Sequence, residues 1–181
     1  MEHYYNVIWA DDDVDILLGE INYLFKRNGI NIIPFTSAKP AIEHIQKNPH
    51  FIDAIIVDAK FPRNGESIQE EGKSFPGLSL FMHELSALRN EYKMPYPCWI
   101  FTGYGSLLRE KYDLDDLAGF EDDIIKKGDS VRVLEEWIES MCEKISQTRS
   151  NEFKLRQDNF KLFELCSDSY LSNNHHRLFH P

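Results

Sequence analysis

The stretch NVIWADDDVD, residues 6–15, places Asp11, Asp12 and Asp13 directly after an apolar run. A short continuous apolar run is typical of a strand that is buried on both faces of a parallel sheet. Adjacent carboxylates raise one another's energy unless water screens them or a positive charge lies between them. The stretch therefore predicts a buried strand that ends either at a solvated turn or at one half of a cation site.

The rest of the chain alternates further apolar runs with segments of helical spacing. The runs are INIIPF (30–35), AIIVDAKFP (54–62), CWIFT (98–102) and DIIKK (123–127). Strands that alternate with helices imply right-handed crossovers and a parallel sheet. The sequence therefore predicts an α/β fold, a doubly wound five-stranded parallel sheet covered by helices on both faces.

Helix boundaries and domain limits follow from the same pattern. Ser37 is expected to cap the helix after the second strand. A long last helix begins after Asp129 or Ser130, and residues 1–145 are assigned to one domain. Residues 146–181 are expected to form a C-terminal extension, helical and then irregular, which is too short for a helix-turn-helix output domain with its own core. They are either a native tail or the start of a further output region.

Composition excludes several classes of protein. The 181 residues carry a formal net charge of −10, so a general nucleic-acid-binding surface is not expected. No apolar run approaches the roughly 18 residues that span a membrane. The three cysteines, Cys98, Cys142 and Cys166, are few and widely spaced, which favours reduced thiols. A soluble, cytoplasmic protein is expected.

Polar side chains follow the predicted strands where each of them ends. They are Asp11 and Asp12, Asp58, Thr102 and Lys127. Ligands of such sheets bind outside the carboxyl ends of the strands. Carboxylates suit Mg²⁺, and an ammonium with a hydroxyl suits a phosphoryl group. Asp58 is then a candidate nucleophile, as carboxylates are in acyl-phosphate chemistry.

With these residues the chain resembles a response-regulator receiver domain of two-component signalling, which has a flavodoxin-like fold. The match spans about residues 5–145. It rests on the pair Asp11-Asp12, on VDAKFP with Asp58, on Thr102-Gly103, and on DDIIKKG with Lys127. These four elements occur in the same order as in the family, and each follows the corresponding strand.

The resemblance implies a metal site. Asp12 and Asp58 would ligate Mg²⁺ directly, Asp11 would act through a water molecule, and the backbone carbonyl of Lys60 would supply a further ligand. Asp13 matches no such role and is expected to be solvated.

The resemblance also implies a phosphorylation-controlled switch. Asp58 would accept a phosphoryl group from a sensor histidine kinase or a histidine phosphotransfer protein, while Thr102 and Lys127 would hold phosphoryl oxygens. Such a domain is regulatory and catalyses only its own phosphorylation and dephosphorylation. A homodimer is a further expected form of association.

The chain departs from the family at three places. Gly128 follows Lys127 where the family has a proline with a cis bond, so a trans bond that aims Lys127 differently is expected. Ile124 stands where the family has a switch aromatic. Residues 63–76 form an apparent insertion before Gly77. Ordering of this insertion and of residues 103–106, in place of ring rotation, is the expected readout.

Two alternatives stay open. A phosphohydrolase of the haloacid-dehalogenase type would use Asp11 as nucleophile and the hydroxyl after WIFT. Its lysine would precede the last acidic motif, however, whereas Asp122-Asp123 here precede Lys127. The second alternative is a degenerate receiver that acts only as a protein-binding module. The identity of the phosphorylated aspartate separates these classes.

Overall fold

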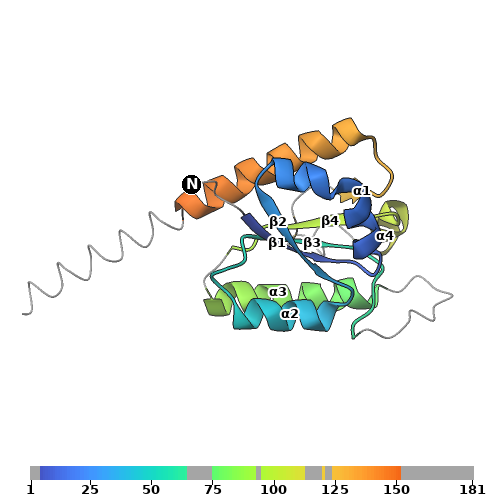
Figure 1. Ribbon diagram of the computed structural model, residues 1–181. Helices are drawn as coiled ribbons and strands as arrows, with labels where there is room; N and C mark the ends of the chain where they lie inside the picture. Colours follow the sequence, from blue (N-terminus) through green and yellow to red (C-terminus); the bar gives the residue numbers. More distant parts are fainter. Residues whose placement is uncertain (1–4, 65–74, 93–94, 113–119, 121–123, 152–181) are drawn as a thin grey trace, which may run out of the picture. The chain divides into compact units, whose positions relative to one another are not determined.

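The computed structural model describes residues 5–64, 75–92, 95–112, 120 and 124–151 (Figure 1). Contacts divide the chain into two compact units, Met1–Ile145 and Ser146–Pro181. The first unit contains the sheet. Residues 146–151 of the second unit are helical, and the remainder of the expected extension lies outside the described residues. An independent C-terminal extension stays a prediction.

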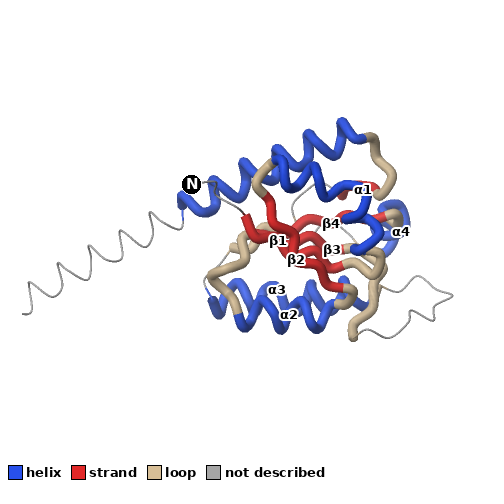
Figure 2. The backbone as a smooth tube through the Cα atoms, in the orientation of Figure 1, coloured by secondary structure: helices blue, strands red, loops and turns tan. Residues whose placement is uncertain are grey.

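A five-stranded parallel sheet forms the centre of the first unit (Figure 2). Its order is β2-β1-β3-β4-β5, so the winding changes direction next to β1. This confirms the predicted doubly wound architecture and puts the carboxyl ends of β1 and β3 side by side. The strands are β1 (Tyr5–Ala10), β2 (Ile30–Phe35), β3 (Ala54–Val57), β4 (Cys98–Thr102) and β5 (Ile124–Lys126).

Helices cover both faces of the sheet, as Figure 1 shows: α2 and α3 lie on one face, and α1 lies on the other with residues 131–145 of the last helix. The remaining helix, α4, follows β4. The bounds are α1 (Val14–Arg27), α2 (Ala38–Lys47), α3 (Pro76–Tyr92) and α4 (Gly105–Lys111). None of the helices in the described part of the chain is long and apolar enough to cross a membrane.

The apolar run of β1 supplies both halves of the core. Val7 and Trp9 pack into the cluster under α1 and the last helix, whereas Ile8 and Ala10 pack into the cluster under α2 and α3. All four are fully buried. This alternation explains why the run is continuous in sequence, since successive side chains of a strand point to opposite faces.

Two helices anchor the segment that follows Asp58. The backbone amides of Ala38 and Lys39, in the first turn of α2, donate to the carbonyls of Pro62 and Arg63 at 3.0 and 2.8 Å. Ser37 is the N-cap residue of α2, as predicted, but its side chain makes no cap hydrogen bond. These carbonyls take up the helix-terminal amides that a serine cap would otherwise bind.

The other anchor lies at the start of α3. The Arg63 guanidinium donates to the carbonyl of Pro76 at 3.1 Å. The amide of Gly77 donates to the carbonyl of Phe61 at 3.0 Å. Phe75 is buried, and its ring centroid lies 6.1 Å from that of Tyr112. The predicted insertion at 63–76 is therefore shorter, because its two ends belong to the fold, and residues 65–74 lie outside the described residues.

Because both ends are anchored, replacing residues 65–74 with a short Gly–Ser linker is expected to change the free energy of unfolding by only about 1 kcal/mol. The measurement is chemical denaturation. The matched variant also removes Phe75, and it should lose roughly 3 kcal/mol more because a buried aromatic ring is lost. Equal stabilities for the two variants would contradict the anchored stem.

Candidate functional site

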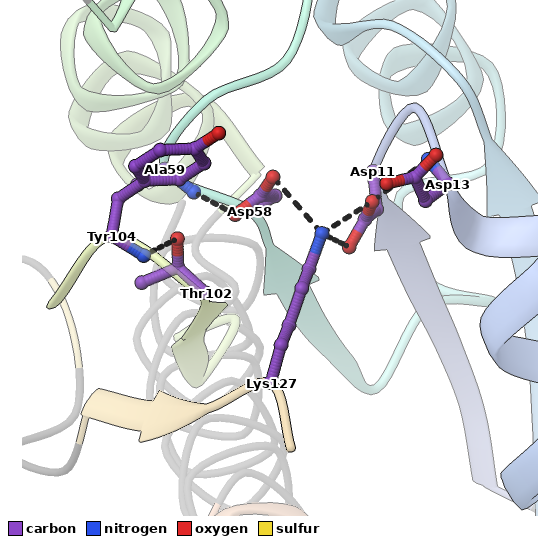
Figure 3. Close-up of polar contacts among 7 residues, drawn as sticks. All are labelled: Asp11, Asp13, Asp58, Ala59, Thr102, Tyr104 and Lys127. Carbon is purple, nitrogen blue, oxygen red and sulfur yellow. Dashed lines mark hydrogen bonds and ion pairs between the residues drawn. The ribbon is translucent and has the colours of Figure 1, made fainter.

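The site is a pocket of about 590 Å³ at the carboxyl end of the sheet. Figure 3 shows its central side chains, which come from the ends of β1, β3 and β4 and from the residue after β5. The lining residues are Asp12, Asp13, Asp58, Lys60, Gly103, Tyr104 and Lys127. The pocket thus contains Asp58 but not Asp11, although both acids are buried.

Lys127 joins two buried acids. Its ammonium donates to Asp11 Oδ1 at 2.9 Å and to Asp58 Oδ2 at 3.1 Å (Figure 3). No cis peptide bond occurs among the described residues, so the bond before Gly128 is trans as expected. Gly128 has a φ of 93°, a left-handed conformation that favours glycine. The trans bond was expected to aim the Lys127 side chain differently, but its ammonium still reaches Asp58.

Asp58 lies directly after β3 and is almost completely buried. Its Oδ1 accepts a hydrogen bond from the amide of Ala59 at 2.7 Å. Burial is the largest influence and raises the pKa of Asp58 to about 6; the negative charge of Asp11 adds to it, and the Lys127 charge and the Thr102 hydroxyl partly offset it. With a pKa of about 6, the carboxyl is mostly ionised at pH 7 and becomes protonated as the pH falls below 6.

Both oxygens of Asp11 lie close to the Lys127 ammonium, but only one of them accepts hydrogen bonds. Its Oδ1 accepts from the amide of Asp13 at 2.9 Å and from Lys127. Its Oδ2 also lies 2.9 Å from the Lys127 ammonium, but the angle does not suit a hydrogen bond and this buried oxygen has no hydrogen-bond partner. A buried carboxylate oxygen without a donor fits a metal ion.

The first three acids form one cluster. Asp11, Asp12 and Asp13 each offer a ligand oxygen, and these oxygens lie within 4.8 Å of one another. Burial raises the pKa of Asp12; a backbone hydrogen bond partly offsets this effect, and the charges of Asp13 and Asp11 add to it. Asp13 is exposed as expected, yet it belongs to this cluster, a role that sequence reasoning set aside. The donor set fits Mg²⁺, a hard cation that binds a few carboxylates and keeps several waters.

Thr102 ends β4 and is fully buried. Its hydroxyl accepts from the amide of Tyr104 at 3.1 Å (Figure 3), and its own proton is donated to Asp58, which lowers the pKa of that carboxyl. α4 begins at Gly105, so the expected loop 103–106 is reduced to Gly103 and Tyr104. Ile124 is half-buried and packs against the core under α2 and α3.

Sequence reasoning missed one contact in the pocket. The Lys60 ammonium lies 5.3 Å from the centroid of the Tyr104 ring. The strand patterns show that both residues follow strand ends, but they do not show that the two side chains meet. Asp122 and Asp123 lie outside the described residues, as do the charged residues of the insertion other than Arg63, which are Glu66, Glu70, Glu71 and Lys73.

No protein-family model and no curated protein matches this sequence. Solved structures share its fold. It is similar to a response regulator receiver domain protein from Clostridium thermocellum, with 20% identity over 79% of this chain and 98% of that chain and a TM-score of 0.53. It is also similar to a CheY-like receiver domain protein from Methanospirillum hungatei, with 17% identity, 80% and 98% coverage and a TM-score of 0.54.

A third similar structure is the receiver domain of the Francisella response regulator 1452, with 23% identity, 77% and 98% coverage and a TM-score of 0.52. These receiver domains are covered almost from end to end. The chain therefore has the receiver fold, which confirms the resemblance at the level of fold.

Proposed function

We propose that this receiver-fold chain is a phosphorylation-controlled signalling switch that accepts a phosphoryl group on Asp58. The observation that carries the proposal is the placement of Asp58, which lines the pocket and accepts a hydrogen bond from Lys127 at 3.1 Å. An Asp58 oxygen attacks phosphorus as the nitrogen–phosphorus bond of a phosphohistidine breaks and its electron pair returns to the imidazole. Lys127 and Thr102 bind the phosphoryl oxygens.

Mg²⁺ is the proposed cofactor. Asp11, Asp12 and Asp58 would hold it, with the backbone carbonyl of Lys60 as a further ligand, and the oxygen cluster adds Asp13 as a candidate. When bound, the ion supplies positive charge against the charge of the phosphoryl group. Lys127 offsets the repulsion between the carboxylates of Asp11 and Asp58, and one of its two hydrogen bonds would pass to a phosphoryl oxygen.

The raised pKa of Asp58 leads to a pH prediction. A metal ion needs the ionised carboxylate, so Mg²⁺ binding displaces the proton from Asp58 and its affinity rises with pH until Asp58 is ionised near pH 7. Calorimetry should show affinity about tenfold weaker near pH 5 than near pH 7.5. Asp58→Asn should remove most of this difference. An Mg²⁺ affinity that is flat across this range would contradict the assignment.

The test of the function is labelling by acetyl phosphate in the presence of Mg²⁺, followed by intact-protein mass spectrometry. Wild type should gain one phosphoryl group, and Asp58→Asn should gain none while keeping its circular dichroism spectrum. Asp11→Asn is the matched control, and it should still label, although slowly, because Asp11 is not the nucleophile. Labelling of Asp58→Asn would contradict the proposal.

The dehalogenase-type alternative has less support than the receiver function. Asp11 does not line the pocket, and one of its oxygens already accepts two hydrogen bonds. A receiver that only binds proteins would show no label in the same experiment. A sensor histidine kinase or histidine phosphotransfer protein as donor, self-association, a cytoplasmic location and the absence of nucleic-acid binding belong to the proposal.

A further inference from the structure

The pocket holds a second ammonium group. Lys127 makes ion pairs with Asp11 and Asp58, at 2.9 and 3.1 Å. Lys60 lines the same pocket, but within the described part of the chain it pairs with no carboxylate, and its contact is the ring of Tyr104. The second ammonium of this acidic pocket thus contacts an aromatic ring.

Tyr104, which carries this ring, is linked to the site by a backbone hydrogen bond. The amide of Tyr104 donates to the hydroxyl of Thr102, and its side chain is 41% exposed. In the view of Figure 3 the Tyr104 ring and Lys127 lie on opposite sides of Asp58. Both lysines line the pocket that contains Asp58; Lys127 bonds to Asp58 directly, and Lys60 lies over the Tyr104 ring.

We propose that Lys60 is a second phosphoryl-binding group, and that Tyr104 holds it until Asp58 is phosphorylated. The proposal rests on the proposed function and adds a residue pair to it. A cation–π contact at a partly exposed ring is weak, whereas a hydrogen bond from an ammonium to a phosphoryl dianion is charge-assisted and stronger. The phosphoryl group therefore takes Lys60 from the ring and frees Tyr104.

This exchange provides an aromatic readout that does not need position 124. Ile124 cannot rotate as a ring would, but a freed Tyr104 changes the surface at the start of α4. A ligand shifts such an equilibrium only through its different affinity for the two states. In this exchange, the difference in affinity comes from the hydrogen bond that the Lys60 ammonium gains to the phosphoryl group.

Affinity for beryllofluoride at saturating Mg²⁺ measures this difference. Lys60→Gln keeps the backbone carbonyl and should weaken binding about tenfold, the worth of one hydrogen bond to a charged group. Tyr104→Leu removes the competing ring and should strengthen binding about twofold to fivefold. Tyr104→Phe keeps a ring and should bind like wild type. In the Lys60→Gln background, Tyr104→Leu should have no effect, because the ring then holds nothing.

Two reporters in one nuclear magnetic resonance titration separate this proposal from the proposed function. The amide of Ala59, bonded to Asp58 at 2.7 Å, reports the phosphoryl mimic. The ε-methylene of Lys60 reports the ring, and its ring-current shift should disappear on binding and be absent in Tyr104→Leu.

A response of Ala59 without a response of Lys60 would overturn the exchange alone. No response at Ala59 would overturn the proposed function and the exchange with it. Tighter binding of Tyr104→Leu in both backgrounds would also overturn the exchange, because Tyr104 would then act as a steric cover.

Discussion

Lys127→Met is expected to lower the free energy of unfolding by about 2–4 kcal/mol near pH 8, because it leaves two buried acids without their cation. Asp11 is completely buried and Asp58 nearly so, and Lys127 bonds to both. The loss should shrink near pH 5. Asp58, with a pKa of about 6, is then largely protonated and needs no partner.

The matched control is Lys126→Met. Lys126 is the exposed neighbour of Lys127, and its replacement should change stability by no more than about 0.5 kcal/mol at either pH. Urea denaturation at the two pH values measures all three proteins. A loss for Lys127→Met that is the same near pH 5 and near pH 8 would mean that the ammonium does not stabilise ionised Asp58.

Gly77→Ala is expected to cost about 3 kcal/mol or more, at the upper end of the range for overpacked sites. A Cβ at this position would lie 2.5 Å from the carbonyl oxygen of Phe61 and 2.8 Å from its ring. The obstacle is backbone as well as side chain, so the start of α3 must move away from the segment that carries Lys60. Mg²⁺ affinity should fall together with stability.

Gly19→Ala is the control for Gly77→Ala. Gly19 is exposed in the middle of α1, and a Cβ there would meet nothing within 4 Å. Alanine should therefore raise stability by about 0.5–1 kcal/mol through helix propensity. Thermal unfolding should give opposite signs for the two variants. A Gly77→Ala protein as stable as wild type would show that α3 does not need this close approach.

The fold was predictable because each strand is a separate apolar run. Both faces of β1 are buried, so Val7, Ile8, Trp9 and Ala10 had to be apolar in succession. The strand ends then followed from the first polar residue after each run, and the topology brought Asp11, Asp58, Thr102 and Lys127 to one edge. These predictions need only local pattern and the handedness of crossovers.

The rest depended on contacts between distant residues. The direction of Lys127 follows from the backbone around Gly128 and from two acids more than sixty residues away in sequence. The sequence pattern placed Phe75 in a polar loop, although its ring packs in the core. Ser37 is the N-cap of α2 as predicted, but the first α2 amides donate to the carbonyls of residues 62 and 63 and not to the Ser37 side chain. Single-sequence patterns do not contain such pairings.

The central claim is that Asp58 is the residue that carries the phosphoryl group. The most direct test is trapping of the acyl phosphate. The protein is incubated with acetyl phosphate and Mg²⁺, treated with borohydride to reduce the acyl phosphate to an alcohol, and mapped by peptide mass spectrometry. We predict conversion of Asp58 to homoserine, dependent on the phosphodonor. Conversion of Asp11, or of no aspartate at all, would contradict the account.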